Sequence, residues 1–230
     1  IILTSNVKYN ENATTKSADT IRSNVITTLT NYSTTNLQKF EGLFRYSQLI
    51  QDIDDTDTSI LSNITTVKIR KNFTPTTGSA ITYNVYFRNA LYNPHSGHNA
   101  SAGGILTSTG FKIDGNNNEM FLDEGGMGNV RRYYMNAGIK VYENINQGTI
   151  DYETGTVTVN SLNIASVSNI RGKAATSIEI IVEPLSRDIV PVRNQVIEVD
   201  TDTLSVISEA DTFAGGSAQA GVGYTTTSGY

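Results

Sequence analysis

The sequence predicts an α+β fold, in which a helical module is followed by a mainly antiparallel β-rich domain. Apolar residues recur at helical spacing near the start of the chain, at Ile21, Val25, Leu29 and Tyr32. From residue 76 onward, short apolar-polar alternations are separated by Asn, Asp and Gly, which is typical of antiparallel strands and turns. The expected segments are an N-terminal extended segment (1–16), a helix-turn-helix-strand module (17–75), a β-rich domain (76–200) and a Gly-rich flexible tail (201–230).

The first helix of the module is expected to begin after Ser17, which can serve as its N-cap. Asp19 then places a carboxylate in the first turn, against the positive end of the helix dipole. The run Val25–Thr30 is rich in β-branched residues and is intrinsically poor in helix, so a strand is the alternative interpretation. We favour the helix because the 3.6-residue period extends beyond this run. Such a helix is marginal alone and must be stabilised by packing.

The rest of the module contains a turn, a second helix and a strand. Gly42 interrupts the apolar sequence after the first helix. A second short helix is expected from Ser47 to about Asp55, with Leu49, Ile50 and Ile53 as its apolar stripe. A strand is expected over Asn63–Ile69, before Pro75.

The β-rich domain is expected to consist of short strands joined by turns. Residues 81–87 alternate in the manner of a half-buried strand. Further strands are expected over 110–113 paired with 119–122, 130–135 with 137–142, 148–152 with 155–159, and then over 177–183 and 195–200. The segment after Thr201 has five Gly, three acids and no Lys or Arg, which indicates an extended or disordered tail.

Composition limits the class of protein. Hydrophobic residues make up 38% and charged residues 17% of the 230 residues, which argues against a coiled coil or a helical bundle. A net charge of −5 gives no general reason to bind nucleic acid or an anionic membrane. No apolar run approaches the ~20 residues of a membrane helix. The chain has no Cys and opens on Ile1 rather than Met, so we expect a piece of a longer protein without thiol chemistry.

Two clusters have the residue types of a metal site, but neither has a complete ligand set. His95 and His98 are three residues apart, yet Pro94 and Gly97 exclude a helix across them and no third ligand is close in sequence. The carboxylates of Asp52, Asp54, Asp55 and Asp57 resemble the start of a calcium loop that lacks its Gly and its closing Glu. We therefore expect loop residues and a solvated acidic turn, with no metal and no cofactor.

The remaining patterns do not indicate catalysis or nucleic-acid binding. Lys68, Arg70 and Lys71 form a small basic strand end, and Arg131-Arg132 forms another, without aromatic residues interleaved as a stacking platform would need. The Gly-rich segments match no phosphate-binding loop, and the sequence contains no nucleophile elbow. We predict no catalytic, cofactor-binding or metal residue, and therefore a protein that is not an enzyme.

Several separated strings resemble phage baseplate proteins. Residues 21–69 resemble the helical end of the baseplate J-like family in Leu29, Tyr32, Gly42, Ser47, Leu49, Ile50 and the strand 64–67. Residues 70–75, 87–95, 148–155 and 191–195 are similar to the C-terminal half of the large wedge subunit of T-even-like contractile-tailed phages. The resemblance covers roughly residues 5 to 210.

The resemblance implies a structural protein of the virion. A wedge subunit would pair with itself, as a homodimer or ring, and with other baseplate wedge proteins around the tail tube, after assembly in the host cytoplasm. It implies no nucleic-acid or membrane partner, and no binding residue is carried over from the family. The alternative is a cell-surface or tail-fibre adhesin that binds a carbohydrate or a protein receptor, because Thr- and Asn-rich β domains serve there as well.

Overall fold

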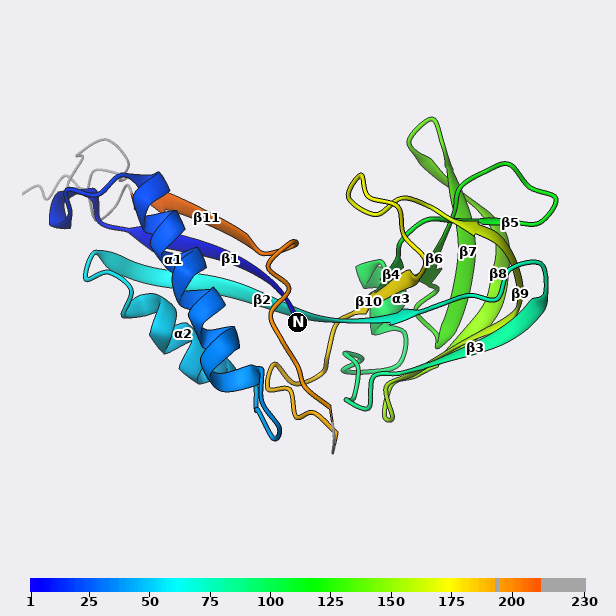
Figure 1. The fold of residues 1–230 in the computed structure, drawn as a ribbon, viewed down its shortest axis with the longest axis horizontal. Helices are drawn as coiled ribbons and strands as arrows, with labels where there is room; N and C mark the ends of the chain where they lie inside the picture. The colour runs from blue at the N-terminus through cyan, green and yellow to red at the C-terminus, as the bar shows by residue number, and fades with distance from the viewer. Residues whose placement is uncertain (193–194, 212–230) are drawn as a thin grey trace, which may run out of the picture. The chain divides into compact units, whose positions relative to one another are not determined.

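The computed structural model describes residues 1–192 and 195–211 (Figure 1). It is mostly β, with 43% strand and 18% helical residues, and part of its sheet closes into a barrel. The expectation of an α+β fold with a helical module is therefore wrong. The helices exist but are short, whereas three strands are much longer than their alternation suggested: β2 (Ile60–Phe73), β8 (Ile139–Asp151) and β9 (Thr156–Val167).

The chain divides into two compact units. Unit 1 comprises residues 1–2 and 67–193, and unit 2 comprises residues 3–66 and 194–230. The division falls within β2. Residues 212–230, which make up most of the expected Gly-rich tail, lie outside the described residues, and residues before them form a strand, β11 (Ser205–Ala210).

Unit 2 is a sheet with helices on one side (Figure 1). Its strands lie in the order β11, β1 (Ile2–Tyr9) and β2, and β11 runs parallel to β1 in the register Thr4↔Ser205 to Tyr9↔Ala210. The helical elements between β1 and β2 are η1 (Glu11–Ala13), α1 (Ala18–Tyr32), the π-turn η2 (Ser33–Leu37) and α2 (Tyr46–Asp54). None of the described helices is long and apolar enough to cross a membrane.

The structure confirms the first helix and its phase. The hydroxyl of Ser17 accepts a hydrogen bond from Thr20 N at 3.2 Å, as an N-cap does. The four residues of the expected stripe are buried: Ile21, Val25, Leu29 and Tyr32. The strand interpretation of Val25–Thr30 is wrong, because burial follows the helical period and packing outweighs the low propensity of the β-branched residues.

The turn after α1 is fixed by an aromatic pair. The rings of Tyr32 and Phe44 meet edge to face with centroids 5.9 Å apart. The Tyr32 hydroxyl donates to the carbonyl of Arg45 at 3.1 Å and accepts from its N–H at 2.9 Å. The second helix is also confirmed, with Leu49 and Ile53 buried, so both helices present apolar side chains to the core of unit 2.

Unit 1 is built around a closed ring of strands, which we call the barrel. In the described residues the ring runs β6–β7–β8–β9–β5 and returns to β6. Its strands not yet given are β5 (Phe111–Ile113), β6 (Met120–Glu124) and β7 (Asn129–Asn136). Outside the ring, β3 (Ala80–Tyr86) pairs with β9. The short strand β4 (Leu106–Ser108) pairs with β6 on one side and with β10 (Ile178–Val182) on the other. β10 in turn pairs with the end of β2.

The close approach of two barrel strands explains one glycine. A Cβ added to Gly148 on β8 would lie 1.9 Å from the carbonyl oxygen of Thr158 on β9. Any side chain here would separate these two strands. The core of unit 1 includes the fully buried side chains of Phe111, Met120 and Leu122.

The three expected strand pairs are confirmed, and one expected strand is wrong. The pairs β5–β6, β7–β8 and β8–β9 correspond to the three predicted pairs. Residues 195–200 form no strand, although their alternation suggested one. Val199 N instead donates to the buried Ser33 hydroxyl at 2.9 Å, so this segment is held by a side chain rather than by a β ladder.

Leu29→Ala should cost ~2–5 kcal/mol of unfolding free energy, because Leu29 is fully buried and its truncation leaves a cavity. Thr27→Ala, on the exposed side of α1, should stay within about 0.5 kcal/mol of the parent. Urea denaturation followed by circular dichroism measures both. Equal losses of unfolding free energy in Leu29→Ala and Thr27→Ala would mean that α1 does not turn Leu29 toward the core.

Candidate functional site

The two histidines form a pair on a loop. His98 Nδ1 lies 3.2 Å from His95 Nε2, and the rings are perpendicular with centroids 4.8 Å apart. The ring of His98 also meets Tyr92 edge to face at 5.4 Å. The short helix α3 (His98–Ala102) begins only after Gly97, so no helix spans both histidines. Within residues 1–192 and 195–211, no group of three or more His, Asp or Glu side chains is placed to hold a metal ion.

The acidic run is solvated only in part: Asp54 and Asp55 are exposed, as the sequence suggested, whereas Asp57 is not. Asp57 is buried: its Oδ2 lies 2.5 Å from Lys16 Nζ, and its Oδ1 accepts from the N–H and the hydroxyl of Ser59 at 2.9 and 2.6 Å. These hydrogen bonds, with that from Lys16 the largest cause, lower the pKa of Asp57 from 3.8 to about 2. The carboxylate therefore joins the segment before α1 to the one after α2.

Asp54 and Asp52 are also used locally. Asp54 accepts a hydrogen bond from Asn63 Nδ2 at 2.7 Å, and Asp52 accepts one from Gln48 Nε2, also at 2.7 Å. These carboxylates do not converge on one point with Asp57, because each is held by a different neighbour. The contacts support a structural role for the acidic run.

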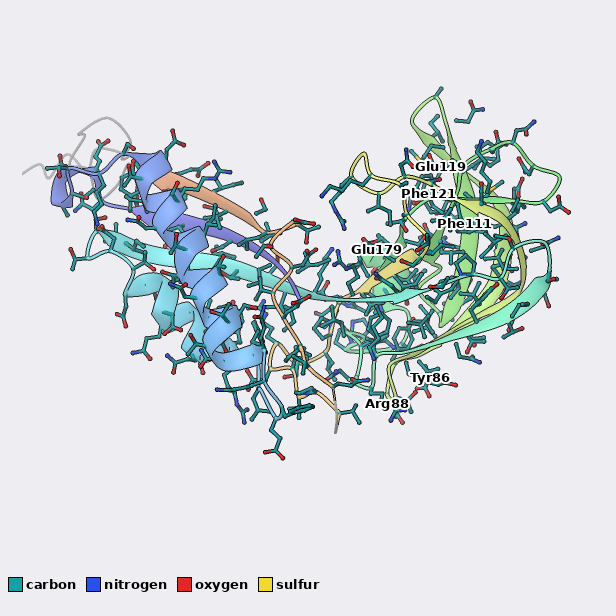
Figure 2. All side chains as sticks on the ribbon, in the orientation of Figure 1. Tyr86, Arg88, Phe111, Glu119, Phe121 and Glu179 are labelled. Atoms are coloured by element: carbon teal, nitrogen blue, oxygen red, sulfur yellow. The ribbon has the colours of Figure 1, made fainter. Side chains whose placement is uncertain are left out.

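Two arginines of unit 1 converge on a buried carboxylate. Glu179 on β10, labelled in Figure 2, is bracketed by Arg70 at 3.4 Å and Arg171 at 3.0 Å. Burial, followed by the charge of Arg88, lowers the pKa of Lys71, whose Nζ donates to the Tyr86 carbonyl at 2.6 Å. Arg70 and Lys71 of the basic strand end are therefore used inside unit 1, whereas Lys68 is exposed.

Aromatic rings contact one residue of the second basic pair, Arg131, and also Lys140, within a cluster around Asp123. Asp123 is 1% exposed and accepts from Arg131 Nε at 2.9 Å and Lys140 Nζ at 2.7 Å. Arg131 lies over the ring of Tyr142 and Lys140 over the ring of Tyr133, each 4.3 Å from the centroid. These partners come from neighbouring strands rather than from neighbouring positions in the sequence. Because both cations are bound to Asp123, the cluster holds β6, β7 and β8 together.

A second hydrogen-bond network surrounds Glu124. The spacing of residues in the sequence does not indicate it, because the donors come from distant positions. Glu124 is 1% exposed, and its carboxylate accepts from Ile105 N at 2.7 Å, from Asn99 Nδ2 at 3.3 Å and from the Tyr152 hydroxyl. Burial, followed by the bond to Glu124, raises the pKa of Tyr152 to about 12. Tyr152 therefore stays a donor at neutral pH, and the network fastens the loop before β4 to the barrel.

In the described residues, the helices of unit 2 lie on one side of its sheet (Figure 1), and we call the other side the open sheet face. Along β1, Leu3, Ser5, Val7 and Tyr9 are buried, and the residues between them point the other way. The hydroxyls of Thr65 and Ser5 meet at 2.9 Å on the buried side, so Ile64 lies on the opposite side. The members of this face are Thr4, Asn6 and Lys8 of β1, Ile64 and Thr66 of β2, and Ile207 and Glu209 of β11.

The open sheet face is suited to contact with another protein. Ile64 is 74% exposed and Ile207 is 47% exposed. Lys8 and Glu209 form an exposed ion pair on neighbouring strands of the same face. Apolar side chains within a polar surface are typical of protein–protein contacts.

The comparison with known families finds a match over the first part of the chain. Residues 1–72 match the model of a family described as baseplate structural protein gp6, C-terminal domain III. No match was found among the curated proteins. The family match supports a structural protein of the phage baseplate, located in the tail baseplate of the virion, and its description is of a structural rather than an enzymatic role. The matched residues contain β1, α1, α2 and nearly all of β2.

Asp57→Asn should destabilise the protein most at neutral pH. Because the folded pKa is lowered to about 2, the ionised carboxylate contributes stability above 3.8, and this contribution is lost as the pH falls toward 2. The difference in urea midpoint between the parent and Asp57→Asn should therefore shrink between pH 5 and pH 2. A difference in urea midpoint that stays constant between pH 5 and pH 2 would show that the ionised carboxylate of Asp57 does not stabilise the fold.

The double variant His95→Ala, His98→Ala should retain the parent's melting temperature, with or without EDTA, because neither histidine has a completed ligand set. A melting temperature that falls by more than ~4 °C on chelation, about 1 kcal/mol for a domain, would show that a bound metal stabilises the parent.

Proposed function

We propose that this chain is part of a wedge subunit of a contractile-tail baseplate. In this proposal it self-associates, assembles in the host cytoplasm and joins neighbouring wedge proteins into the ring around the tail tube. The observation that carries the proposal is the family match over residues 1–72. It falls on β1, α1, α2 and most of β2, so the match includes the part of the open sheet face that β1 and β2 form.

The geometry of unit 2 supports a structural subunit. A sheet covered by helices on one side has a second side available for a broad contact, and a ring needs the same contact repeated in every subunit. Ile64 on β2 supplies the most exposed apolar side chain of the open sheet face, and Ile207 lies on β11, with β1 between them. We assign this face to neighbouring wedge proteins.

The chemistry of the buried polar groups also fits a structural role. Asp57, Asp123 and Glu179 each bind cationic side chains from other segments, and Glu124 accepts three hydrogen bonds. Each carboxylate thereby connects segments distant in sequence.

Ile64→Lys should leave the chain folded and abolish its recruitment by neighbouring wedge proteins. The side chain is largely exposed, so the melting temperature should change by less than ~2 °C, as a surface substitution does. Purified wedge proteins of the same phage, mixed with the parent chain and with the variant, would be followed by mass photometry. The matched control is Ile139→Lys in unit 1, which has similar exposure.

Recruitment of the parent and of Ile139→Lys, but not of Ile64→Lys, is the expected result. If the wedge proteins fail to recruit the parent chain, the baseplate proposal is overturned. A parent chain that ignores them and binds an immobilised glycan saturably would be an adhesin instead.

A further inference from the structure

We propose that the edge of β8 near the tip of the β7–β8 hairpin binds an extended peptide segment of another protein, which adds to it as an antiparallel strand. β9 pairs with β8 only over residues 148–151. Among the described residues, no strand therefore pairs with residues 139–142 on the side away from β7, and we call this side the β8 edge. An unpaired strand edge is a template for an added strand. The β8 edge belongs to unit 1 and is no part of the open sheet face.

The turn of the hairpin determines which backbone groups of β8 face outward. Ala137 and Gly138 both have positive φ, +47° and +82°, as a two-residue type I′ turn requires. The two residues that flank such a turn, here Asn136 and Ile139, exchange both of their backbone hydrogen bonds. Bonded pairs then alternate with non-bonded pairs along the ladder.

Successive residues of β8 therefore direct their backbone groups to opposite sides. Ile139 and Val141 bond to β7, whereas Lys140 and Tyr142 direct their N–H and C=O groups to the β8 edge. In the part of the chain that the structure describes, these outward groups have no backbone or side-chain partner. Where β8 approaches β9, by contrast, Gln147 Nε2 donates to a carbonyl of β9 at 2.5 Å. The unmet hydrogen bonds are thus confined to the end of the hairpin.

The side chains of the same two residues are held away from the β8 edge. Lys140 Nζ donates to Asp123 Oδ2 at 2.7 Å, and the Tyr142 hydroxyl donates to the same oxygen at 3.0 Å. Asp123 lies on β6, beyond β7, and Lys140 Nζ passes over the β7 ring of Tyr133, 4.3 Å from its centroid. A lysine on an edge strand ordinarily hinders pairing, but this ammonium is bound two strands away. The edge is therefore both accessible and fixed before a partner binds, which lowers the entropic cost of binding.

The side chains beside the β8 edge specify the chemistry of the partner. On one face of the hairpin Ile139 is 69% exposed and Val141 is half-buried, which favours β-branched side chains on the added strand. On the other face Arg131 and Lys140 share one carboxylate, that of Asp123, so one positive charge is in excess. The ammonium of Lys140 has three donors and gives one of them to Asp123, so an acidic side chain opposite Lys140 complements this face. The partner is therefore an extended segment in which acidic and β-branched residues alternate.

The test is fluorescence anisotropy of a labelled peptide of alternating Glu and Val, titrated with the full chain. We expect saturable binding of this peptide and none of a peptide of alternating Lys and Val. The Glu residues lie opposite Lys140 and Tyr142, so their N–H groups donate to β8, whereas those of the Val residues point to solvent. N-methylation of the Glu residues should therefore abolish binding, and N-methylation of the Val residues should leave it unchanged.

A pair of variants tests the same hydrogen bonds from the side of the protein. Lys140→Pro removes an outward N–H group and keeps the bonds to β7, since proline is tolerated at the edge of a sheet. Lys140→Ala is the matched control, because both substitutions remove the same side chain. Lys140→Pro should bind the peptide roughly tenfold more weakly than Lys140→Ala. In the parent, bound peptide should slow hydrogen exchange of the Tyr142 amide and leave that of Val141 unchanged.

Four results would each overturn the inference. They are no saturable binding up to about 1 mM peptide, equal binding of the two N-methylated peptides, equal affinity of Lys140→Pro and Lys140→Ala, and protection of the Tyr142 amide that rises with the concentration of the chain alone. The last result would mean that a second copy occupies the β8 edge. Ile64→Lys should bind the peptide as the parent does, because Ile64 belongs to the open sheet face. Recruitment by neighbouring wedge proteins is assigned to that face, so the proposed function is tested separately.

Discussion

The pairing of β6 on both edges is the constraint on which unit 1 depends. One edge pairs with β7, and the other is shared by β4 and β5, which meet it through Thr107↔Asp123 and Phe111↔Met120. Through β5 the hydrogen bonds continue to β9 and close the barrel, and through β4 they continue to β10 and the end of β2. Because backbone groups in a sheet need partners on both sides, this branch joins the barrel and the outer strands in one network.

Buried charges reinforce these ladders. Asp123 and Glu124 are adjacent on β6, and their side chains bind different sets of donors. Removing one partner of such a cluster leaves a buried carboxylate without compensation, which costs more than the intact cluster contributes. The clusters therefore define the pairing of β6, β7 and β8, and a slipped register would leave Asp123 without Arg131.

Local periodicity was sufficient to predict the helices and the hairpins, since their partners lie a few residues away. Ser17, Leu29 and Ile53 occupy the positions that the pattern indicated. The barrel could not be predicted in this way, because β3 pairs with β9 and β5 with β9 across long stretches of chain, with bulges that break the alternation. The ion pair of Lys16 with Asp57 and the cation–aromatic contacts of Arg131 and Lys140 could not be predicted either, because the partners are not neighbours in the sequence. Phe40 was visible in the sequence, but its exposure depends on the strained turn at Glu41.

The parallel pairing of β1 with β11 has a consequence for the order of folding during synthesis. These strands meet in the register Thr4↔Ser205, so about two hundred residues separate partners that lie side by side. On a translating ribosome the strands of the barrel, which end with Val167, emerge before β11 exists. β1 must therefore wait for β11, with the edge later taken by β11 unpaired in the meantime. Unit 2 is thus completed after unit 1, and a chain released early would carry an open edge.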